Sequence, residues 1–130
     1  MKTVIRSEAE MKDSKITWMK EIPITWKTPK LLHVLRSKIS DGPHETPTYV
    51  DRGIPFISID SLNNDKNINF STCKRYISEE DYKKYSSKTN LEEGDILFSK
   101  AATIGKTAIV GNERFMIWSP LAIIKNDKNF

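Results

Sequence analysis

Two polar segments of the chain carry side chains of the kinds that proteins use to contact DNA. Asparagine can hydrogen-bond adenine through two atoms at once, while lysine and arginine can read guanine or bind phosphate. In residues 61–69 and 100–106 these side chains are Asn63, Asn64, Lys66, Lys100, Thr103 and Lys106. The alternative is that the asparagine-rich segment only forms turns, because asparagine tolerates a left-handed backbone. Residue types alone leave both interpretations open.

The sequence Gly105-Lys106-Thr107 ends like a phosphate-binding P-loop. That motif requires another glycine five positions before Gly105, and it opens a helix. Here Lys100 occupies that position, and a β-like segment, residues 107–110, follows the loop. We therefore predict a hairpin loop in which Gly105 adopts a positive φ, a conformation that glycine reaches without steric penalty.

Two other segments match catalytic motifs only in part. Residues 46–49 resemble the motif of amino-methyltransferases in which an Asp, Asn or Ser precedes Pro-Pro-aromatic, but the second proline and the leading acceptor are absent. Asp81 and Lys83 have the spacing of a nuclease Asp-x-Lys motif, but a charged helix face explains that spacing better. The sequence therefore predicts no catalytic centre.

Histidine and cysteine are too few to build a tetrahedral zinc site, since the chain has only His33, His44 and Cys73. We interpret His33, which lies in an apolar stretch, as a core or sheet-edge residue. His44 lies in a loop with glycine and proline, where it either caps the loop or contacts a ligand. A lone cysteine cannot form an internal disulfide, and no apolar stretch has the length of a signal peptide or membrane span. We expect a cytoplasmic protein.

The composition is that of a soluble globular domain. The 130 residues are 38% hydrophobic and 29% charged, which excludes the disordered, collagen-like and coiled-coil classes. The net charge is +4, with 10 basic against 9 acidic side chains in residues 1–65 and 11 against 8 in residues 66–130. Because no basic run occurs, a surface for a polyanion would have to be assembled by folding.

Short apolar runs between turn residues predict an α+β domain of mainly antiparallel sheet. The expected strands are residues 55–60, 95–100, 107–110, 115–118 and 121–125. Ser78, followed by three acids and then Lys83 and Lys84, predicts a short helix over residues 79–86, because serine caps a helix and these charges oppose its dipole. Residues 31–39 fit either a short helix or a turn into a strand, and residues 41–53 and 61–69 are expected to be loops.

The first 30 residues have a different sequence pattern from the rest of the chain. Residues 1–13 are polar and without periodicity, so we predict a flexible tail followed by one domain over residues 14–130. Prolines in residues 14–30 argue against a long helix and favour an extended arm. The aromatic side chains that we expect to pack are Trp18, Trp26, Phe56 and Phe98.

An ordered set of short motifs runs through residues 12–126. It consists of Lys12-Asp13-Ser14, Trp18, Ile22-Pro23, Trp26, Asp41-Gly42-Pro43-His44, Thr46-Pro47, Gly53-Ile54-Pro55-Phe56-Ile57, Gly94-Asp95-Ile96-Leu97-Phe98-Ser99-Lys100, Ile104-Gly105 and Ala108-Ile109-Val110. In this order and spacing the chain resembles the amino-terminal target recognition domain of the specificity subunit of type I restriction–modification enzymes.

The resemblance implies a non-catalytic domain that reads one half of a bipartite site in double-stranded DNA. Partner methylation subunits would carry S-adenosylmethionine and flip the target adenine out of the duplex, and a motor and nuclease subunit would complete the complex. This chain would need no cofactor of its own. The spacer helices and the second recognition domain of the family are absent from the 130 residues.

Carried onto this sequence, the resemblance makes residues 41–49, 61–69 and 100–106 the DNA-facing loops. The side chains expected at base edges are His44, Thr46, Tyr49, Asn63, Asn64 and Lys66. Those expected at phosphates are Lys74, Arg75, Lys100 and Lys106. Gly42, Pro43 and Gly105 would shape the backbone. Two alternatives remain open: a module that acts through protein–protein assembly, and a stand-alone nuclease or methyltransferase fragment.

Overall fold

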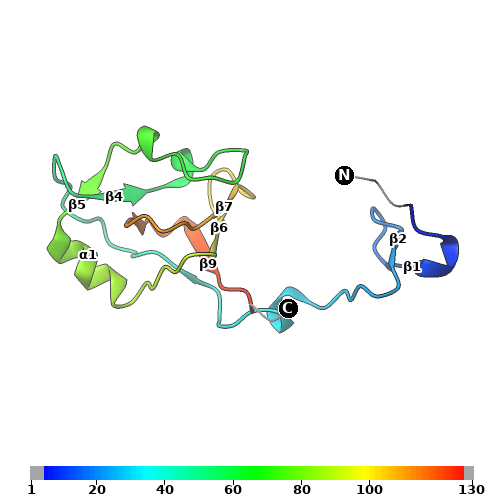
Figure 1. Ribbon diagram of the computed structural model, residues 1–130. Coiled ribbons are helices and arrows are strands. Elements are labelled where there is room, and N and C mark those ends of the chain that lie inside the picture. Colours follow the sequence, from blue (N-terminus) through cyan, green and yellow to red (C-terminus); the bar gives the residue numbers. More distant parts are fainter. Residues whose placement is uncertain (1–4, 128–130) are drawn as a thin grey trace. The chain divides into compact units, whose positions relative to one another are not determined.

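The computed structural model describes residues 5–127 of the chain (Figure 1). The chain divides into two units, Met1–Val34 (unit 1) and Leu35–Phe130 (unit 2), and the described residues of each are treated separately. Among the described residues, no helix has the length and apolar character needed to cross a membrane.

Unit 1 is a small hairpin flanked by two 3-10 turns. The turn η1 (Glu8–Glu10) leads into strand β1 (Met11–Asp13), which pairs antiparallel with β2 (Glu21–Pro23), and η2 (Leu31–His33) follows. The Ser14 backbone N–H donates to the Lys20 carbonyl at 2.7 Å and closes the hairpin loop. The structure therefore places regular elements in residues 8–13, where we predicted a tail, because β1 has a partner ten residues away. Residues 1–4 lie outside the described part of the chain.

The two indoles of unit 1 are exposed, so the prediction that they pack is wrong. Trp18 is 80% exposed and Trp26 is 57% exposed. Trp18 lies in the turn of a two-stranded hairpin, and such a hairpin has no second layer that could cover an indole. His33, at the end of η2, is exposed as well and is not a core residue.

Unit 2 contains an antiparallel sheet of four strands. Its order is β3-β9-β6-β7, with β3 at Ser40–Asp41, β9 at Leu121–Ile124, β6 at Ile96–Ser99 and β7 at Thr107–Ile109. The inner strands β6 and β9 supply fully buried side chains, Leu97 and Leu121 among them. Strands β6 and β7 form the predicted hairpin, and Gly105 in its loop has a φ of +98° as predicted.

A second sheet of three strands completes unit 2. Its order is β5-β4-β8, with β5 at Tyr76–Ile77, β4 at Ile54–Ile57 and β8 at Met116–Ile117, and β4 pairs parallel with β8. The 3-10 turns η3 (Ile59–Ser61) and η4 (Phe70–Thr72) lie between β4 and β5. The sheets are therefore mixed as well as antiparallel, and the α+β class is confirmed.

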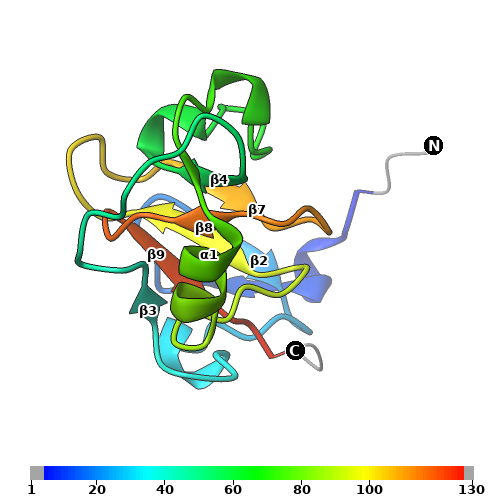
Figure 2. The same ribbon diagram turned by 90° about the vertical axis from the view of Figure 1, so that its left-hand side faces the viewer.

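Helix α1 spans Glu79–Ser86, the predicted range. The Ser78 hydroxyl caps it by accepting a hydrogen bond from the Asp81 backbone N–H at 3.1 Å. The buried side chain of Tyr85 packs with Phe56 and Met116, so α1 covers the three-stranded sheet. Figure 2 shows the helix in front of β8. Phe56 is a core residue as predicted, whereas Phe98 is only partly buried.

Candidate nucleic-acid interface

Two of the three predicted loops meet in one hollow of unit 2. The hollow has a volume of about 310 Å³ and is lined by Asn63, Asn64, Lys66, Thr103, Ile104, Gly105, Lys106 and Thr107. Five of these side chains are among those that we predicted to contact DNA. Figure 1 shows the β6–β7 loop beside the segment after η3, although some 40 residues separate them in the sequence. We call this site the amide–lysine hollow.

The asparagine side of the amide–lysine hollow is held by backbone pairing. Leu62 and Ile68 form an isolated antiparallel bridge, and the Asn63 N–H donates to the Asn67 carbonyl at 3.2 Å. Lys66 lies at the tip with a φ of +67°, and its carbonyl accepts from the Ile109 N–H at 3.0 Å. Because Ile109 belongs to the edge strand β7, this bond fixes the loop of residues 61–69 to the β6–β7 hairpin.

The lysine side of the hollow depends on the buried hydroxyl of Ser99, at the end of β6. The Ser99 Oγ accepts from the Lys106 N–H at 2.8 Å and donates to the Thr103 carbonyl at 2.5 Å. The Gly105 N–H donates to the Ser99 carbonyl at 3.0 Å. In the sequence, Ser99 stands out only as part of the motif Gly94–Lys100. A small polar residue that ends an apolar strand just before a glycine loop was the available signal.

The amide–lysine hollow carries positive charge without compensation inside it. Lys66 and Lys106 line it, and no carboxylate does. Within residues 5–127, neither lysine forms an ion pair. Amide groups for base edges and unpaired ammonium groups for phosphates therefore share one surface.

The third predicted loop borders a different hollow, of about 630 Å³, which we call the β3–α1 hollow. Its lining residues are Ser40, Asp41, Gly42, Pro43, His44, Glu45, Lys84, Tyr85 and Lys88. Gly42 begins the loop in close contact with β8, because a Cβ built on it would lie 2.4 Å from the Ile117 carbonyl oxygen. This close approach agrees with the predicted backbone role of Gly42.

Two of the basic side chains that line the β3–α1 hollow, His44 and Lys84, lie against carboxylates. His44 Nε2 lies 3.1 Å from both carboxylate oxygens of Asp41, and Lys100 Nζ forms an ion pair with the same carboxylate. Lys84 Nζ lies 2.9 Å from Glu45 Oε1. Burial would raise the pKa of Asp41, but the hydrogen bonds from Lys100 and His44 outweigh it and hold that pKa below its ordinary value.

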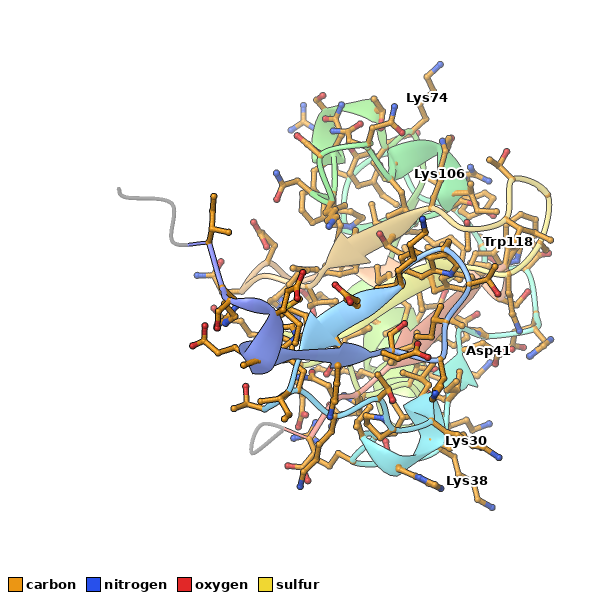
Figure 3. All side chains as sticks on the ribbon, turned by 90° about the vertical axis from the view of Figure 1, so that its right-hand side faces the viewer. Lys30, Lys38, Asp41, Lys74, Lys106 and Trp118 are labelled. Atoms are coloured by element: carbon orange, nitrogen blue, oxygen red, sulfur yellow. The ribbon has the colours of Figure 1, made fainter. Side chains whose placement is uncertain are left out.

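The remaining predicted contacts lie outside both hollows. Lys74 is exposed, whereas Arg75 lies 3.5 Å from Asp60 and stacks 6.0 Å from the Trp118 ring centre. Tyr49 packs at 6.1 Å against the Phe56 ring, and Thr46 is exposed. Figure 3 shows Lys74 and Lys106 in the upper half of unit 2 and Lys38 at its lower end. The structure thus gathers five of the eleven predicted side chains in one place.

In the part of the chain that the structure describes, no three side chains among His, Cys, Asp and Glu lie close enough together to bind a metal ion.

Comparison with known proteins identifies the family of the chain. Residues 23–129 match the family described as the Type I restriction modification DNA specificity domain. No curated protein matches the chain. The family match covers unit 2, with both hollows, and the end of unit 1. The chain belongs to the type I restriction–modification DNA specificity domains, is a target recognition domain of a specificity subunit, and serves in DNA recognition.

Proposed function

We propose that unit 2 reads one half of a bipartite site in double-stranded DNA through the amide–lysine hollow. This proposal rests on one observation: Asn63, Asn64 and Lys66 line the same hollow as the β6–β7 loop. The amides of Asn63 and Asn64 are suited to base edges in the major groove. Lys66 and Lys106 are suited to the phosphates that flank those bases.

In this proposal the chain performs no chemistry itself and directs partner subunits to a site. A methylation subunit with S-adenosylmethionine, and a motor and nuclease subunit, would act on the DNA that the domain has selected. The support is the family match together with the absence of a predicted catalytic motif. A domain that reads one half-site binds weakly by itself, because the second half-site normally raises its effective concentration.

Selection from a random duplex library tests the proposal. The full chain, immobilised through a terminal tag, should enrich duplexes that share a short, ungapped motif. Binding to the pool should weaken with salt, and Lys106→Ala should reduce the slope of log K against log salt by about 0.9.

The matched control is Lys38→Ala, which removes an exposed lysine at the opposite end of unit 2 (Figure 3). This variant should keep the wild-type slope. Binding that does not change with salt, or a pool without a shared motif, would contradict the proposal and favour a module that acts through protein–protein assembly.

A further inference from the structure

The Asp41 carboxylate occupies a position between two side chains that were predicted to contact DNA. Both its oxygens lie 3.1 Å from His44 Nε2, and one forms an ion pair with Lys100 Nζ. A DNA phosphate offers the same features to these side chains, namely negative oxygens that accept hydrogen bonds. Asp41 and a phosphate are therefore alternative partners for the Lys100 ammonium group.

The backbone holds this arrangement in place from both sides. Asp41 pairs with Ala122 across β3 and β9, and its carbonyl accepts from Thr89 Oγ1 at 3.3 Å. The Lys100 N–H donates to the Pro120 carbonyl at 3.0 Å. The backbones of both residues are therefore held in place, and the long side chain of Lys100 can turn toward another anion.

The ion pair links the β3–α1 hollow to the β6–β7 loop. Asp41 lines the β3–α1 hollow, and Lys100 begins the loop whose residues 103–106 line the amide–lysine hollow. The side chains of Lys100 and Asp41 are 40% and 27% exposed, so an external anion can reach the pair. The other pair of the β3–α1 hollow, Lys84 and Glu45, is more exposed at 55% and 56%, and solvent screens it more strongly.

We propose that Asp41 competes with DNA phosphates for Lys100 and so weakens binding to duplex DNA of any sequence. This inference rests on the proposed function. A phosphate that binds Lys100 must first break the ion pair between Lys100 and Asp41, so the phosphate contact adds little to the affinity. Target and random duplexes both supply phosphates, and only the target supplies base contacts as well. Asp41 therefore lowers the affinity for both kinds of duplex by the same factor.

The test measures binding of the full chain to a random duplex and to a selected half-site duplex, at 50–200 mM salt. Asp41→Asn keeps the shape of the side chain and frees Lys100. It should tighten random-duplex binding and steepen the log–log salt slope by about 0.9, which makes the fall in affinity over this range about 3.5-fold larger. Affinity for the half-site duplex should rise by the same factor, because the freed lysine contacts phosphate on either duplex.

Two variants separate this role from a general effect of charge. Glu79→Gln changes the net charge equally and frees Arg114, but neither residue lines a hollow, so it should leave the random-duplex affinity unchanged. In a Lys100→Met background, Asp41→Asn should no longer tighten binding. A gain that persists without Lys100, or that Glu79→Gln reproduces, would overturn the proposal.

Folding of each variant is checked by its denaturant midpoint, and Asp41→Ser serves as a second way to remove the carboxylate. Failure of this inference is distinct from failure of the proposed function. If wild type binds with salt dependence and a sequence preference while both Asp41 variants bind like wild type, only the Asp41 role is wrong. If no variant binds DNA, the proposed function itself is wrong.

Discussion

The backbone nitrogen of Lys106 lies 2.8 Å from the Oγ of Ser99, whose side chain is completely buried. The same hydroxyl donates to the Thr103 carbonyl at 2.5 Å. One buried side chain therefore positions the two polar residues that the β6–β7 loop contributes to the amide–lysine hollow. A single hydroxyl that both accepts and donates therefore links the two ends of the loop.

Replacement of Ser99 by alanine should destabilise unit 2 and loosen the loop. The Lys106 N–H would lose its partner beside the core, which costs about 1–3 kcal/mol in the free energy of unfolding. Denaturant unfolding measures this loss. The control is Ser87→Ala, because the exposed Ser87 hydroxyl donates to the Lys84 carbonyl at 2.7 Å and water can replace it. Equal stability losses from both variants would refute the positioning role.

The two glycines with positive φ provide a matched pair of substitutions. Gly105 has a φ of +98° and Gly94 a φ of +90°, and a Cβ on either would meet no atom within 4 Å. Alanine at each position should cost about 1–2 kcal/mol from backbone strain alone. Only Gly105 lines the amide–lysine hollow, so only Gly105→Ala should also weaken DNA binding. Comparable weakening by Gly94→Ala would show that binding reports stability and not loop shape.

Gly42→Ala should lower the free energy of unfolding more than Gly111→Ala. A Cβ at Gly42 would lie 2.4 Å from the Ile117 carbonyl oxygen, and this backbone group cannot move without shifting β8. We expect a loss of about 1–3 kcal/mol. At Gly111 the nearest atom is the flexible end of Glu113, at 2.5 Å, which can turn away. Thermal unfolding of both variants checks this order, and a reversed order would contradict the packing of Gly42 against β8.

Acid should remove the stabilisation that Asp41 provides. Its hydrogen bonds from Lys100 and His44 outweigh burial, so its pKa is lower in the folded than in the unfolded chain. Such a group stabilises the fold fully above its unfolded pKa, about pH 4, and loses that contribution as pH falls through the folded pKa. The stability difference between wild type and Asp41→Asn should therefore shrink between pH 5 and the lower pH at which Asp41 is protonated. A constant difference over that range would contradict the lowered pKa.

Local sequence patterns predicted helix α1 and five strands of unit 2, but not the two-residue strands β3 and β5. Helix α1 begins and ends where its serine cap and charges indicate, and the β6–β7 hairpin follows from apolar runs around Gly105. Strand ends differ by up to three residues. The parallel pairing of β4 with β8 joins segments about 60 residues apart, and a single sequence holds no local signal for such a partner.

The structure brings part of the predicted interface together, and the contacts of these side chains with DNA stay a prediction. Composition indicated Asn64 and Lys106, and the structure places both in one hollow. Sequence could not show that Asp41 pairs with Lys100, because the two are 59 positions apart and meet only through the pairing of β3 with β9 and β9 with β6. The tryptophans of unit 1 were predicted to pack because indoles are usually buried, but the hairpin has no layer to cover them.

In the proposed interface, Asn64 reads a base pair and Lys106 binds a phosphate. Binding to single-base-pair variants of a selected half-site tests these two roles most directly. Lys106→Ala should weaken binding to every duplex alike. Asn64→Ala should abolish the preference at one base pair, with a loss of about 1–3 kcal/mol on the selected duplex and little change where that pair is already altered. Uniform losses from both variants on all duplexes would contradict the account.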